Sequence, residues 1–436
     1  MRVSLLFAAL LFAPSASPAT AADGLAAAVE HAVDLPDPAA RAKAADALAK
    51  RPGVTVDALL PVLRAFGRFR PKDPGIHHEV AALRDGRVEV PSEITVYVPP
   101  GYDPAKAAPL LMAFHGAGGR GEDMPGMWKG TADALGMIVV APSDMGPNGG
   151  YEYSSEERAL ALSALRWARR TFHVDENRIH AAGVSRGGHL VWDLVLRHPD
   201  LFASAAPMIG GPRISNGKGE NNLRFLENVV HLPIRDLQGS GDHPLLLASL
   251  RFAFDRLAGW RAEDAKLIEF PDLGHAFDFG AVDWTEFLGN ARRDPGRDRV
   301  VRCTLDGAEG RAFWAEVQDV GRGAKTEIVL TVDPKAWEAM DEVEKREYHT
   351  RHAERLTARL FVHRKGPGVY AASGRHVDRF RLLLPEDAFT PGEPVVVSLN
   401  GRTTRVRPAA DPRVLLRDFV ERFDRTWLPV AAVEIH

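Results

Sequence analysis

Residues 178–199, RIHAAGVSRGGHLVWDLVLRHP, constrain this chain more than any other stretch. Ile179–Val184 is a short run of small and apolar residues, which is typical of a strand buried on both faces. The spacing G-x-S-x-G follows, centred on Ser185, and apolar residues then appear at helical spacing until Pro199. The stretch therefore predicts a strand, a tight turn that carries a serine, and a helix.

Two glycines flank this serine, and their missing side chains explain how such a turn forms. The turn requires strained backbone at Ser185, and a β-carbon at Gly183 or Gly187 would collide with the strand or the helix. The serine hydroxyl then stands clear of the sheet, with the N-terminus of the helix behind it to stabilise negative charge. The bare spacing is a weak signal, and the alternative is a glycine-rich turn with an incidental serine. The flanking strand and helix make the functional interpretation specific.

The first 22 residues predict a secretory signal peptide. Met1-Arg2 precedes an apolar run over Val3–Ala13, and small residues with A-x-A-like cleavage sites fill Pro14–Ala22. This run is too short for a spanning helix, and the alternative is a buried N-terminal helix. No later run of 18 apolar residues follows, so we expect a secreted or periplasmic protein without a membrane span.

Composition is that of a globular protein and gives no sign of a nucleic-acid partner. The formal net charge is −3, and 45% of the residues are hydrophobic. Cys303 is the single cysteine, so an exported chain would have no internal disulfide. Because Cys303 lies in an alternating segment with Val301 and Leu305, we expect it to be a small buried hydrophobic residue.

Changes of pattern along the chain divide it into four regions. We expect a signal peptide over residues 1–22, an N-terminal helical segment over 23–87, an α/β region over 88–294 and a β-rich C-terminal domain over 295–436. His77-His78-Glu79 lacks the spacing that places two histidines on one helical face. It therefore predicts a polar linker and not a metal site.

Strands alternate with helices between residues 88 and 294, which predicts an α/β fold with a doubly wound, mostly parallel sheet. The expected strands there are Ile94–Val98, Leu110–Phe114, Met137–Ala141, Ile179–Val184, Ser204–Ile209, Leu232–Leu237 and Lys266–Phe270, with an amphipathic helix over Ser155–Phe172. The expected strands of the C-terminal domain are Arg311–Val317, Thr326–Val332, Leu356–Val362, Phe380–Leu384 and Pro394–Leu399, with a helix-like segment over Pro334–Glu354 and a hairpin turn at Asn400-Gly401.

A serine hydroxyl needs a base, and the base needs a carboxylate that orients it. His275 follows the expected strand Lys266–Phe270 on a loop, where a catalytic histidine would lie, a surface histidine being the alternative. Asp242 stands in a glycine-containing loop after another expected strand, whereas its rival Asp236 lies inside the strand pattern. Ser185, Asp242 and His275 are therefore the candidate catalytic residues.

Stabilising an oxyanion requires two N–H donors held in place beforehand. The backbone N–H of Arg186, directly after the serine, is one candidate. The run His115–Gly119, HGAGG, has little side-chain bulk and lets backbone approach a substrate closely. We expect the second donor at Ala117, with Gly118 as the next choice, and we expect His115 and Gly118 to line the substrate site.

Three aromatic residues are further candidates for substrate binding. Trp128, Tyr151 and Tyr153 are expected on loops after sheet strands, where they would stack against an aromatic or sugar ring, and a structural role is equally open. Only about 22 residues, Gly210–His231, separate two expected strands. Large lids need more chain, so we expect an open cleft and a substrate with a short acyl chain or an aryl group.

Residues from about Glu93 to Leu288 resemble the α/β-hydrolase superfamily. The resemblance is carried by PLLMAFHGAGG, VDENRIHAAGVSRGG, LPIRDLQGSGD and FPDLGHAF, which stand in family order. It is closest to the compact esterases of the feruloyl esterase, polyhydroxybutyrate depolymerase-like and dienelactone hydrolase-like groups. It implies Ser185 as nucleophile, Asp242 as acid and His275 as base. The N-terminal helices and the C-terminal domain lie outside it.

The resemblance implies a secreted serine carboxylic-ester hydrolase that works through an acyl-enzyme on small or polysaccharide-linked esters. We expect no metal and no organic cofactor, and the sequence does not indicate an oligomeric state. One alternative is a serine peptidase of the prolyl oligopeptidase type, although about 70 helical residues cannot supply an N-terminal propeller. The other is a catalytically inactive carbohydrate-binding or surface protein, against which the complete set of candidate residues argues.

Overall fold

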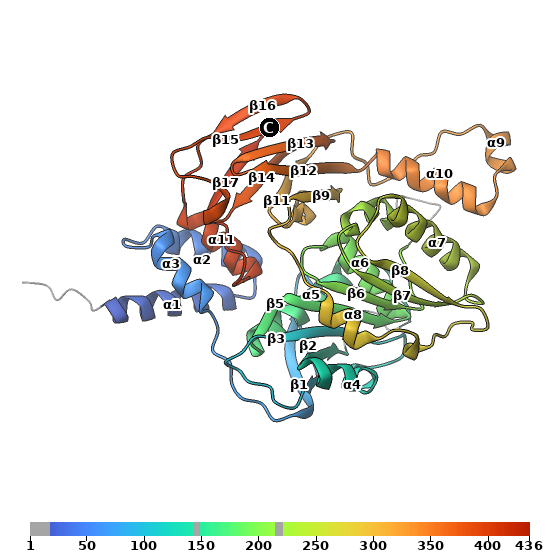
Figure 1. Ribbon diagram of the computed structural model, residues 1–436, viewed down its shortest axis with the longest axis horizontal. Helices are drawn as coiled ribbons and strands as arrows, with labels where there is room; N and C mark the ends of the chain where they lie inside the picture. The colour runs from blue at the N-terminus through green and yellow to red at the C-terminus, as the bar shows by residue number, and fades with distance from the viewer. Residues whose placement is uncertain (1–17, 144–145, 147–148, 214–220) are drawn as a thin grey trace, which may run out of the picture. The chain divides into compact units, whose positions relative to one another are not determined.

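The structure is a computed structural model that describes residues 18–143, 146, 149–213 and 221–436 (Figure 1). The chain forms two compact units. One consists of Met1–Phe66 with Asp411–Leu428, and the other of Gly67–Ala410 with Pro429–His436. Most of the predicted signal peptide, residues 1–17, lies outside the described residues, and the first described helix begins at Pro18.

The first unit is helical and joins residues from both ends of the sequence. Its helices are α1 (Pro18–Asp34), α2 (Pro38–Ala49), α3 (Val56–Arg64) and α11 (Pro412–Arg422). Helix α11 packs on α2, where Arg41 binds Glu421 at 2.8 Å and Asp46 binds Arg417 at 2.6 Å. Phe66 packs edge-on against Phe419 with 5.1 Å between ring centroids. The predicted β-rich region therefore contains a helix that completes the N-terminal helical unit.

An eight-stranded sheet forms the α/β part of the second unit, with strand order β1-β2-β4-β3-β5-β6-β7-β8. The strands are β1 (Gly75–Arg84), β2 (Glu89–Val98), β3 (Ala108–Phe114), β4 (Ile138–Pro142), β5 (Val174–Val184), β6 (Ser204–Met208), β7 (Ile234–Gly239) and β8 (Ala265–Phe270). Strands β1 and β2 run antiparallel to their neighbours, and the other strands are parallel. The predicted mostly parallel α/β sheet is confirmed.

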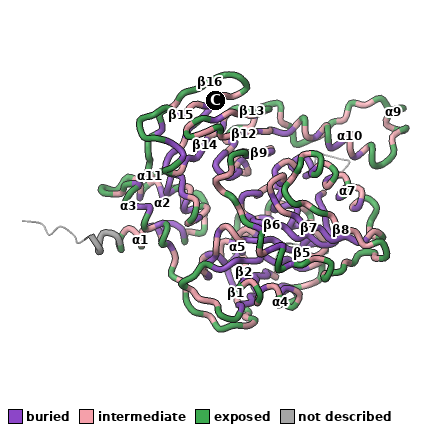
Figure 2. The backbone as a smooth tube through the Cα atoms, viewed as in Figure 1, coloured by how far each residue is buried: buried purple, intermediate pink, exposed green. Residues whose placement is uncertain are grey.

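Helices cover both faces of this sheet, which explains why its central strands are continuous apolar runs. The helices are α4 (Pro125–Leu135), α5 (Ser155–Thr171), α6 (Arg186–Arg197), α7 (Pro244–Gly259) and α8 (Trp284–Asn290), with 3-10 turns η1 (Gly121–Asp123), η2 (Asn222–Val229) and η3 (Phe279–Ala281). On β3, Leu110 and Met112 pack with α5, α6 and α7, whereas Leu111 packs with α4 and α8. Strands β3, β4 and β6 are buried along their whole length, and the middle of the sheet is accordingly purple in Figure 2.

The sheet begins earlier than the predicted start of the α/β region at residue 88. Strand β1 alternates exposed and half-buried residues over most of its length, and Ile76 and Val80 are exposed. The prediction of a polar linker at His77-His78-Glu79 is wrong, because these residues pair with β2. A strand this exposed lacks the apolar run by which the other strands were predicted. The predicted domain boundaries at 87/88 and 294/295 stay predictions.

Two smaller sheets follow, with strand orders β10-β11-β14-β17 and β16-β15-β13-β12-β9. Their strands are β9 (Arg299–Thr304), β10 (Arg311–Ala312), β11 (Ala315–Val320), β12 (Ala358–Gly366), β13 (Val369–Arg375), β14 (Val377–Leu384), β15 (Val395–Leu399), β16 (Arg402–Val406) and β17 (Ala431–Ile435). The same region holds α9 (Pro334–Ala339), α10 (Glu342–Arg355), η4 (Gly307–Glu309) and η5 (Glu386–Ala388). Strand β11 contacts β9 and β12 of the other sheet. We call residues 295–410 and 429–436 the β-rich region.

Of two predictions for the β-rich region, the structure confirms one and contradicts the other. The hairpin turn is confirmed, because Leu399 pairs with Arg402 and both Asn400 and Gly401 have positive φ, 48° and 85°. The strand predicted over Thr326–Val332 is wrong, since the structure describes these residues as neither strand nor helix. Val329 there is 73% exposed, so its alternating pattern marks no buried face.

Cys303 lies at the contact between the β-rich region and the eight-stranded part. Its backbone N–H donates to Asn228 Oδ1 at 2.6 Å, and its carbonyl accepts from Asn228 Nδ2 at 2.9 Å. Its side chain is 4% exposed and joins the core that includes residues of α6 and η2. Burial raises the pKa of the thiol to about 12. The prediction of a small buried hydrophobic residue is confirmed.

Arg224, on η2, is a second buried link between the same two regions. Its guanidinium donates to Thr357 Oγ1 and to the Lys325 carbonyl, both at 2.7 Å, and to the Leu356 carbonyl at 2.9 Å. Burial lowers the pKa of this side chain to about 10. Arg224 also donates to the Thr326 carbonyl at 3.2 Å, so a single buried arginine supplies donors to four acceptors of the β-rich region.

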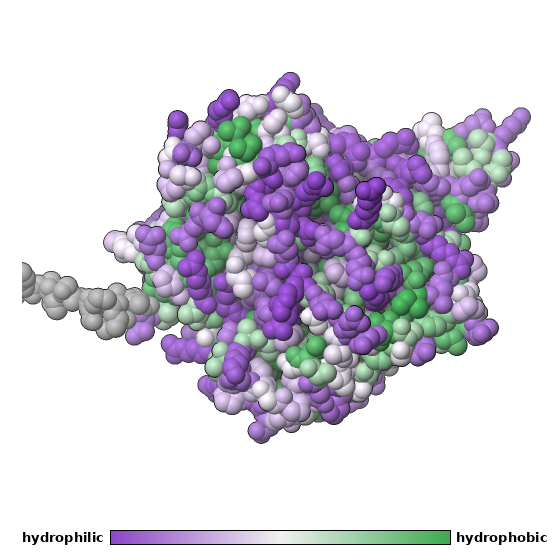
Figure 3. All heavy atoms as spheres, in the orientation of Figure 1, coloured by the Kyte–Doolittle hydropathy of each residue, from purple (hydrophilic) through white to green (hydrophobic). Residues whose placement is uncertain are grey.

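None of the helices in the described ranges is long and apolar enough to cross a membrane. On the face drawn in Figure 3, hydrophilic side chains are spread widely and apolar ones are interspersed among them.

Candidate active site

Ser185 stands on the turn between β5 and α6 in strained backbone, with φ 53° and ψ −111°. A β-carbon built at Gly183 would lie 2.3 Å from the Gly187 carbonyl oxygen. One built at Gly187 would lie 2.1 Å from the Phe114 carbonyl oxygen. Both distances are far below van der Waals contact, so the two glycines are what allow the strand, the turn and the helix to approach one another.

A chain of hydrogen bonds runs from this serine to a carboxylate. Ser185 Oγ lies 2.8 Å from His275 Nε2, and His275 Nδ1 lies 2.7 Å from Asp242 Oδ2. Because an ionised carboxylate only accepts hydrogen bonds, Nδ1 carries the ring proton of a neutral His275. Nε2 is then free to accept the hydroxyl proton of Ser185. The structure thus brings together Ser185, His275 and Asp242, the three residues that were predicted from the sequence.

Two further donors hold Asp242 as a carboxylate. Gln238 Nε2 donates to Oδ2 and the His243 backbone N–H donates to Oδ1, each at 2.6 Å. Burial acts to raise the pKa of Asp242, but the hydrogen bonds from His243, His275 and Gln238 outweigh it and lower the pKa. Gln238 was missed from the sequence, where it is one polar residue at the end of a strand with no motif around it.

The loops that carry Asp242 and His275 approach each other backbone to backbone. A β-carbon at Gly239 would lie 1.9 Å from the Gly274 carbonyl oxygen, so only glycine fits there. The Gly241 N–H donates to the Leu273 carbonyl at 2.8 Å. This contact fixes the separation of acid and base without any intervening side chain.

Asp236, the rival acid, faces a different part of the molecule. It is fully buried on β7 and accepts a hydrogen bond from Trp192 Nε1 on α6 at 2.7 Å. Burial raises its pKa well above the ordinary value for aspartate. Asp236 therefore hydrogen-bonds Trp192, whereas the carboxylate at hydrogen-bond distance from His275 is that of Asp242.

The predicted oxyanion loop lies beside Ser185. A β-carbon built at Gly116 would be 3.7 Å from Ser185 Cβ, and the Gly119 N–H closes a tight turn onto the Gly116 carbonyl at 3.1 Å. Gly118 is exposed on this turn with φ 74°. Arg186 is the first residue of α6. The backbone N–H groups of Ala117 and Arg186 stay the predicted donors.

Two predicted substrate-binding side chains are instead buried. His115 is 2% exposed, with Nδ1 2.7 Å from the Gly116 carbonyl and Nε2 3.0 Å from the Ser143 carbonyl, so it braces the loop and does not line a surface. Trp128 is fully buried on α4 and packs edge-on against Phe279 and Trp284. The prediction that Trp128 binds substrate is wrong, because helix α4 directs its indole ring into the core.

Tyr151 and Tyr153 lie on the segment before α5 and are half-buried. The Tyr151 hydroxyl donates to Asp193 Oδ2 at 2.9 Å, and the Tyr153 hydroxyl donates to the Gly211 carbonyl at 2.7 Å. Tyr153 also has a positive φ of 60°, which is uncommon for an aromatic residue. The hydroxyls are thus engaged within the protein, while the rings are partly accessible.

Comparison with known proteins gives one relative in sequence. No protein-family model matches the chain. It is 29% identical over 195 residues to feruloyl esterase C of Emericella nidulans, an alignment that covers 42% of this chain and 71% of that protein.

Among solved structures, a thermostable esterase is 21% identical and has a TM-score of 0.41. Its alignment covers 50% of this chain and 63% of that chain. An acetyl xylan esterase from Aspergillus awamori is 15% identical with a TM-score of 0.40, and the alignment covers 49% of this chain and 99% of the other.

Sequence relationship and geometry point in the same direction. The relative is an esterase, and the chain has a mostly parallel sheet with a serine on the strained turn between a central strand and its helix. A histidine and a carboxylate from two later loops complete the hydrogen-bond chain to that serine. The chain therefore has a helix-covered, mostly parallel α/β sheet with a serine, a histidine and a carboxylate in one hydrogen-bond chain at its edge, and it is similar over part of its length to a feruloyl esterase.

Proposed function

We propose that this chain is a secreted carboxylesterase that cleaves short-chain or aryl esters, free or attached to a polysaccharide, through an acyl-enzyme on Ser185. The hydrogen-bond chain from Ser185 through His275 to Asp242 carries this proposal. It supplies a nucleophile, a base and an orienting carboxylate at hydrogen-bond distance before any substrate binds.

In the first half of the reaction, His275 Nε2 takes the hydroxyl proton as Ser185 Oγ bonds to the ester carbonyl carbon. Asp242 stabilises the imidazolium that forms, because its lowered pKa keeps it ionised. His275 then gives its proton to the leaving alcohol as the carbon–oxygen ester bond breaks. Water repeats the sequence on the acyl-enzyme, releases the carboxylic acid and restores Ser185.

The negative charge on the carbonyl oxygen needs donors during both halves. The Arg186 N–H at the start of α6 and the Ala117 N–H on the neighbouring loop would supply them. The glycines around Ala117 leave space for a substrate carbonyl to reach the backbone.

The proposed substrate class rests on the relative and on the site surroundings. The curated relative is named a feruloyl esterase, whose ester has an aryl acyl group. Half-buried Tyr151 and Tyr153 would offer ring surface to such a group. The open cleft expected around Gly210–His231 includes residues 214–220, which lie outside the described residues, and it stays a prediction.

A fluorophosphonate probe tests the nucleophile, and a panel of p-nitrophenyl esters tests the substrate. We expect labelling of the wild type and none of Ser185→Ala. We expect faster hydrolysis of acetate and butyrate than of palmitate, and no reaction with amides of matched acyl groups. A preference for palmitate that rises above its micelle threshold would identify a lipase, and faster cleavage of the amides a peptidase.

Export is tested separately from catalysis. Expressed with its own N-terminus in a bacterial host, the chain should accumulate outside the cytoplasm and begin near residue 22 or 23 by N-terminal sequencing. A full-length protein retained in the cytoplasm would contradict the signal peptide and leave the esterase proposal standing.

A further inference from the structure

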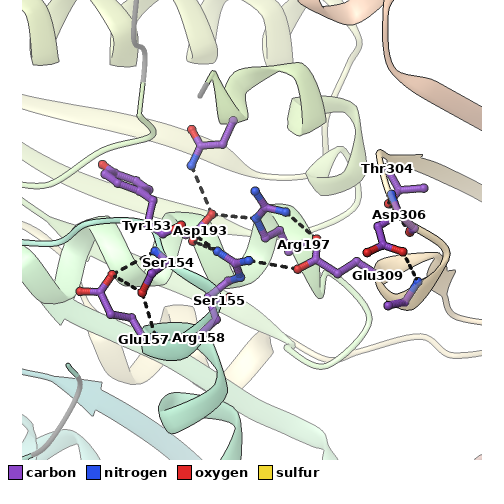
Figure 4. Close-up of polar contacts among 12 residues, drawn as sticks. Tyr153, Ser154, Ser155, Glu157, Arg158, Asp193, Arg197, Thr304, Asp306 and Glu309 are labelled. Carbon is purple, nitrogen blue, oxygen red and sulfur yellow. Dashed lines mark hydrogen bonds and ion pairs between the residues drawn. The ribbon is translucent and has the colours of Figure 1, made fainter. Parts of the chain in front are cut away.

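Four charged side chains meet where α5 and α6 contact the β-rich region (Figure 4). We call Arg158, Asp193, Arg197 and Glu309 the charge cluster. Arg158 donates to Asp193 Oδ2 at 2.9 Å and to Glu309 Oε1 at 3.2 Å. Arg197 donates to Asp193 Oδ1 at 3.1 Å and forms a second ion pair with Glu309. Each arginine thus bridges the same two carboxylates.

The charge cluster is a neutral unit that is buried at Asp193 and Arg158 and half-buried at Arg197 and Glu309. The side chain of Asp193 has no exposed surface, that of Arg158 is 9% exposed and that of Glu309 is 24% exposed. Two positive and two negative charges cancel, which offsets the cost of desolvating them. Burial acts to raise the pKa of Glu309, but Arg197 and Arg158 outweigh it and lower the pKa. Glu309 is therefore held ionised between the two arginines.

Glu309 is the single member of the cluster that comes from the β-rich region. It ends η4, the turn between β9 and β10, and lies 151 residues along the chain from Arg158. Asp193 and Arg197 share one face of α6, the helix that begins directly after Ser185. Through Glu309 the β-rich region thus forms an ion pair with the helix that follows the nucleophile.

The charge cluster also holds the Tyr151–Tyr153 segment. The Tyr151 hydroxyl donates to Asp193 Oδ2 at 2.9 Å, and Arg158 donates to the Tyr153 carbonyl at 3.0 Å. Both ends of this three-residue segment are therefore hydrogen-bonded to the cluster. Its positive φ at Tyr153 is a strained conformation that persists only where surrounding contacts enforce it.

Tyr153 reaches from the cluster to the site. Its hydroxyl donates to the Gly211 carbonyl at 2.7 Å and lies 2.8 Å from His189 Nδ1. Gly211 follows Gly210, where a β-carbon would be 2.5 Å from the Ser185 carbonyl oxygen. The Tyr153 ring is consequently fixed next to the backbone that carries the nucleophile.

We propose that Glu309 is a positioning residue that sets the Tyr151–Tyr153 segment as one wall of the substrate site and so determines affinity for aryl esters. This inference rests on the proposed esterase function. The side chain of Glu309 pairs with Arg158 and Arg197 and not with Ser185. It acts by holding Arg158 and Arg197 against Asp193, and through them the two tyrosines.

The test compares Glu309→Gln with Glu354→Gln in the full-length protein. Glu354 is a matched control, because it pairs with Arg256 at 2.8 Å between α10 and α7, is 23% exposed and does not contact the charge cluster. The substrates are methyl ferulate and p-nitrophenyl acetate, and the rate of fluorophosphonate labelling reports on Ser185 alone. Tyr151→Phe reaches the same segment without removing a charge, should Glu309→Gln fold poorly.

We expect Glu309→Gln to raise KM for methyl ferulate about fivefold or more, with kcat, labelling and KM for p-nitrophenyl acetate changed less than twofold. Glu309→Asp should recover part of the loss, and Tyr151→Phe should raise the same KM. Glu354→Gln should change none of these values. An active wild type whose Glu309→Gln and Tyr151→Phe variants behave like Glu354→Gln would overturn the positioning role alone. A wild type that neither reacts with the probe nor cleaves esters would overturn the proposed function as well.

Discussion

The eight-stranded sheet and its contact with the β-rich region are both buried, but different chemistry holds them. Strand β3 is buried along its whole length by aliphatic and aromatic side chains on both faces. At the contact, apolar residues such as Val301 and Cys303 are joined by buried polar side chains, which include Arg224, Asn228 and Asp193, and by the half-buried Glu309. Apolar burial is non-directional, whereas each of these polar groups needs a particular partner.

Because of this difference, we expect the sheet and the contact with the β-rich region to respond differently to substitution. The sheet supplies a rigid base whose stability does not depend on the polar side chains at its edge, so catalytic residues there can change without unfolding the protein. The contact depends on each partner, because a buried donor left unpaired pays its full desolvation cost. We therefore expect substitutions at the sheet edge to reduce activity and substitutions at the contact to reduce stability.

The largest expected effect is that of Ser185→Ala on catalysis. Without its nucleophile the enzyme should lose about 10⁶-fold in kcat, the scale at which other serine hydrolases respond. The free energy of unfolding should stay within about 1 kcal/mol of wild type, because the residue at the turn keeps its β-carbon. Ester hydrolysis and urea unfolding check both values. A marked loss of stability would show that the serine belongs to the packing of the sheet edge.

The next effect separates two carboxylates of the same strand and loop. Asp242→Asn should lower kcat about 10⁴-fold, because an amide no longer holds His275 in the productive tautomer. Asp236→Asn should lower it less than tenfold, since Asp236 hydrogen-bonds Trp192 and not His275. Steady-state kinetics on p-nitrophenyl acetate distinguish the two. A larger loss of kcat for Asp236→Asn than for Asp242→Asn would show that Asp236 is the catalytic acid.

At the contact, Arg224→Met should destabilise the protein by about 3 kcal/mol, because four acceptors of the β-rich region lose a charged donor. Activity per folded molecule should be unchanged. Arg251→Met is the control, since the Arg251 side chain is 54% exposed where it pairs with Glu269, and its loss should cost less than about 1 kcal/mol. Equal losses of stability in urea would remove the distinction between a surface ion pair and the buried contact.

The smallest effect concerns pH and Glu309. Its pKa is lower in the folded protein than in the unfolded chain, so the carboxylate stabilises the fold above its unfolded pKa, and this contribution disappears as pH falls through the folded value. Glu309→Gln should therefore have a lower Tm than wild type at pH 7, by an amount equivalent to about 1 kcal/mol. The difference should narrow as the pH falls below the ordinary pKa of glutamate and through the lower folded value. A gap that does not vary with pH would show that geometry and not charge holds the contact.

The sheet and the candidate triad were predictable because their signals are local. Leu110–Phe114 and Ile179–Val184 are apolar runs that only a doubly covered strand explains. Gly183 and Gly187 mark the strained turn, and Asp242 and His275 each follow such a strand directly. Where a residue's role depends on its immediate neighbours, the sequence contains the necessary information.

Two causes account for the remaining errors, namely deciding contacts that are distant in sequence and, for β1, an exposed face. Trp128 looked available until helix α4 placed it against Phe279 and Trp284, about 150 residues away. Strand β1 lacks an apolar run because one of its faces is largely exposed. Glu309 gave no signal, because its partner Arg158 lies 151 residues earlier. A polar contact between residues so far apart in sequence produces no periodic pattern from which it could be predicted.

Cys303 gives the natural protein a built-in reporter for that contact. The chain has one thiol, which is buried between β9 and η2, and its raised pKa leaves almost no reactive thiolate in the closed state. A thiol reagent should then modify the protein only when the β-rich region separates from η2. The rate of that single, stoichiometric reaction would measure how often the contact opens, with no label or substitution introduced, while ester turnover is followed in the same sample.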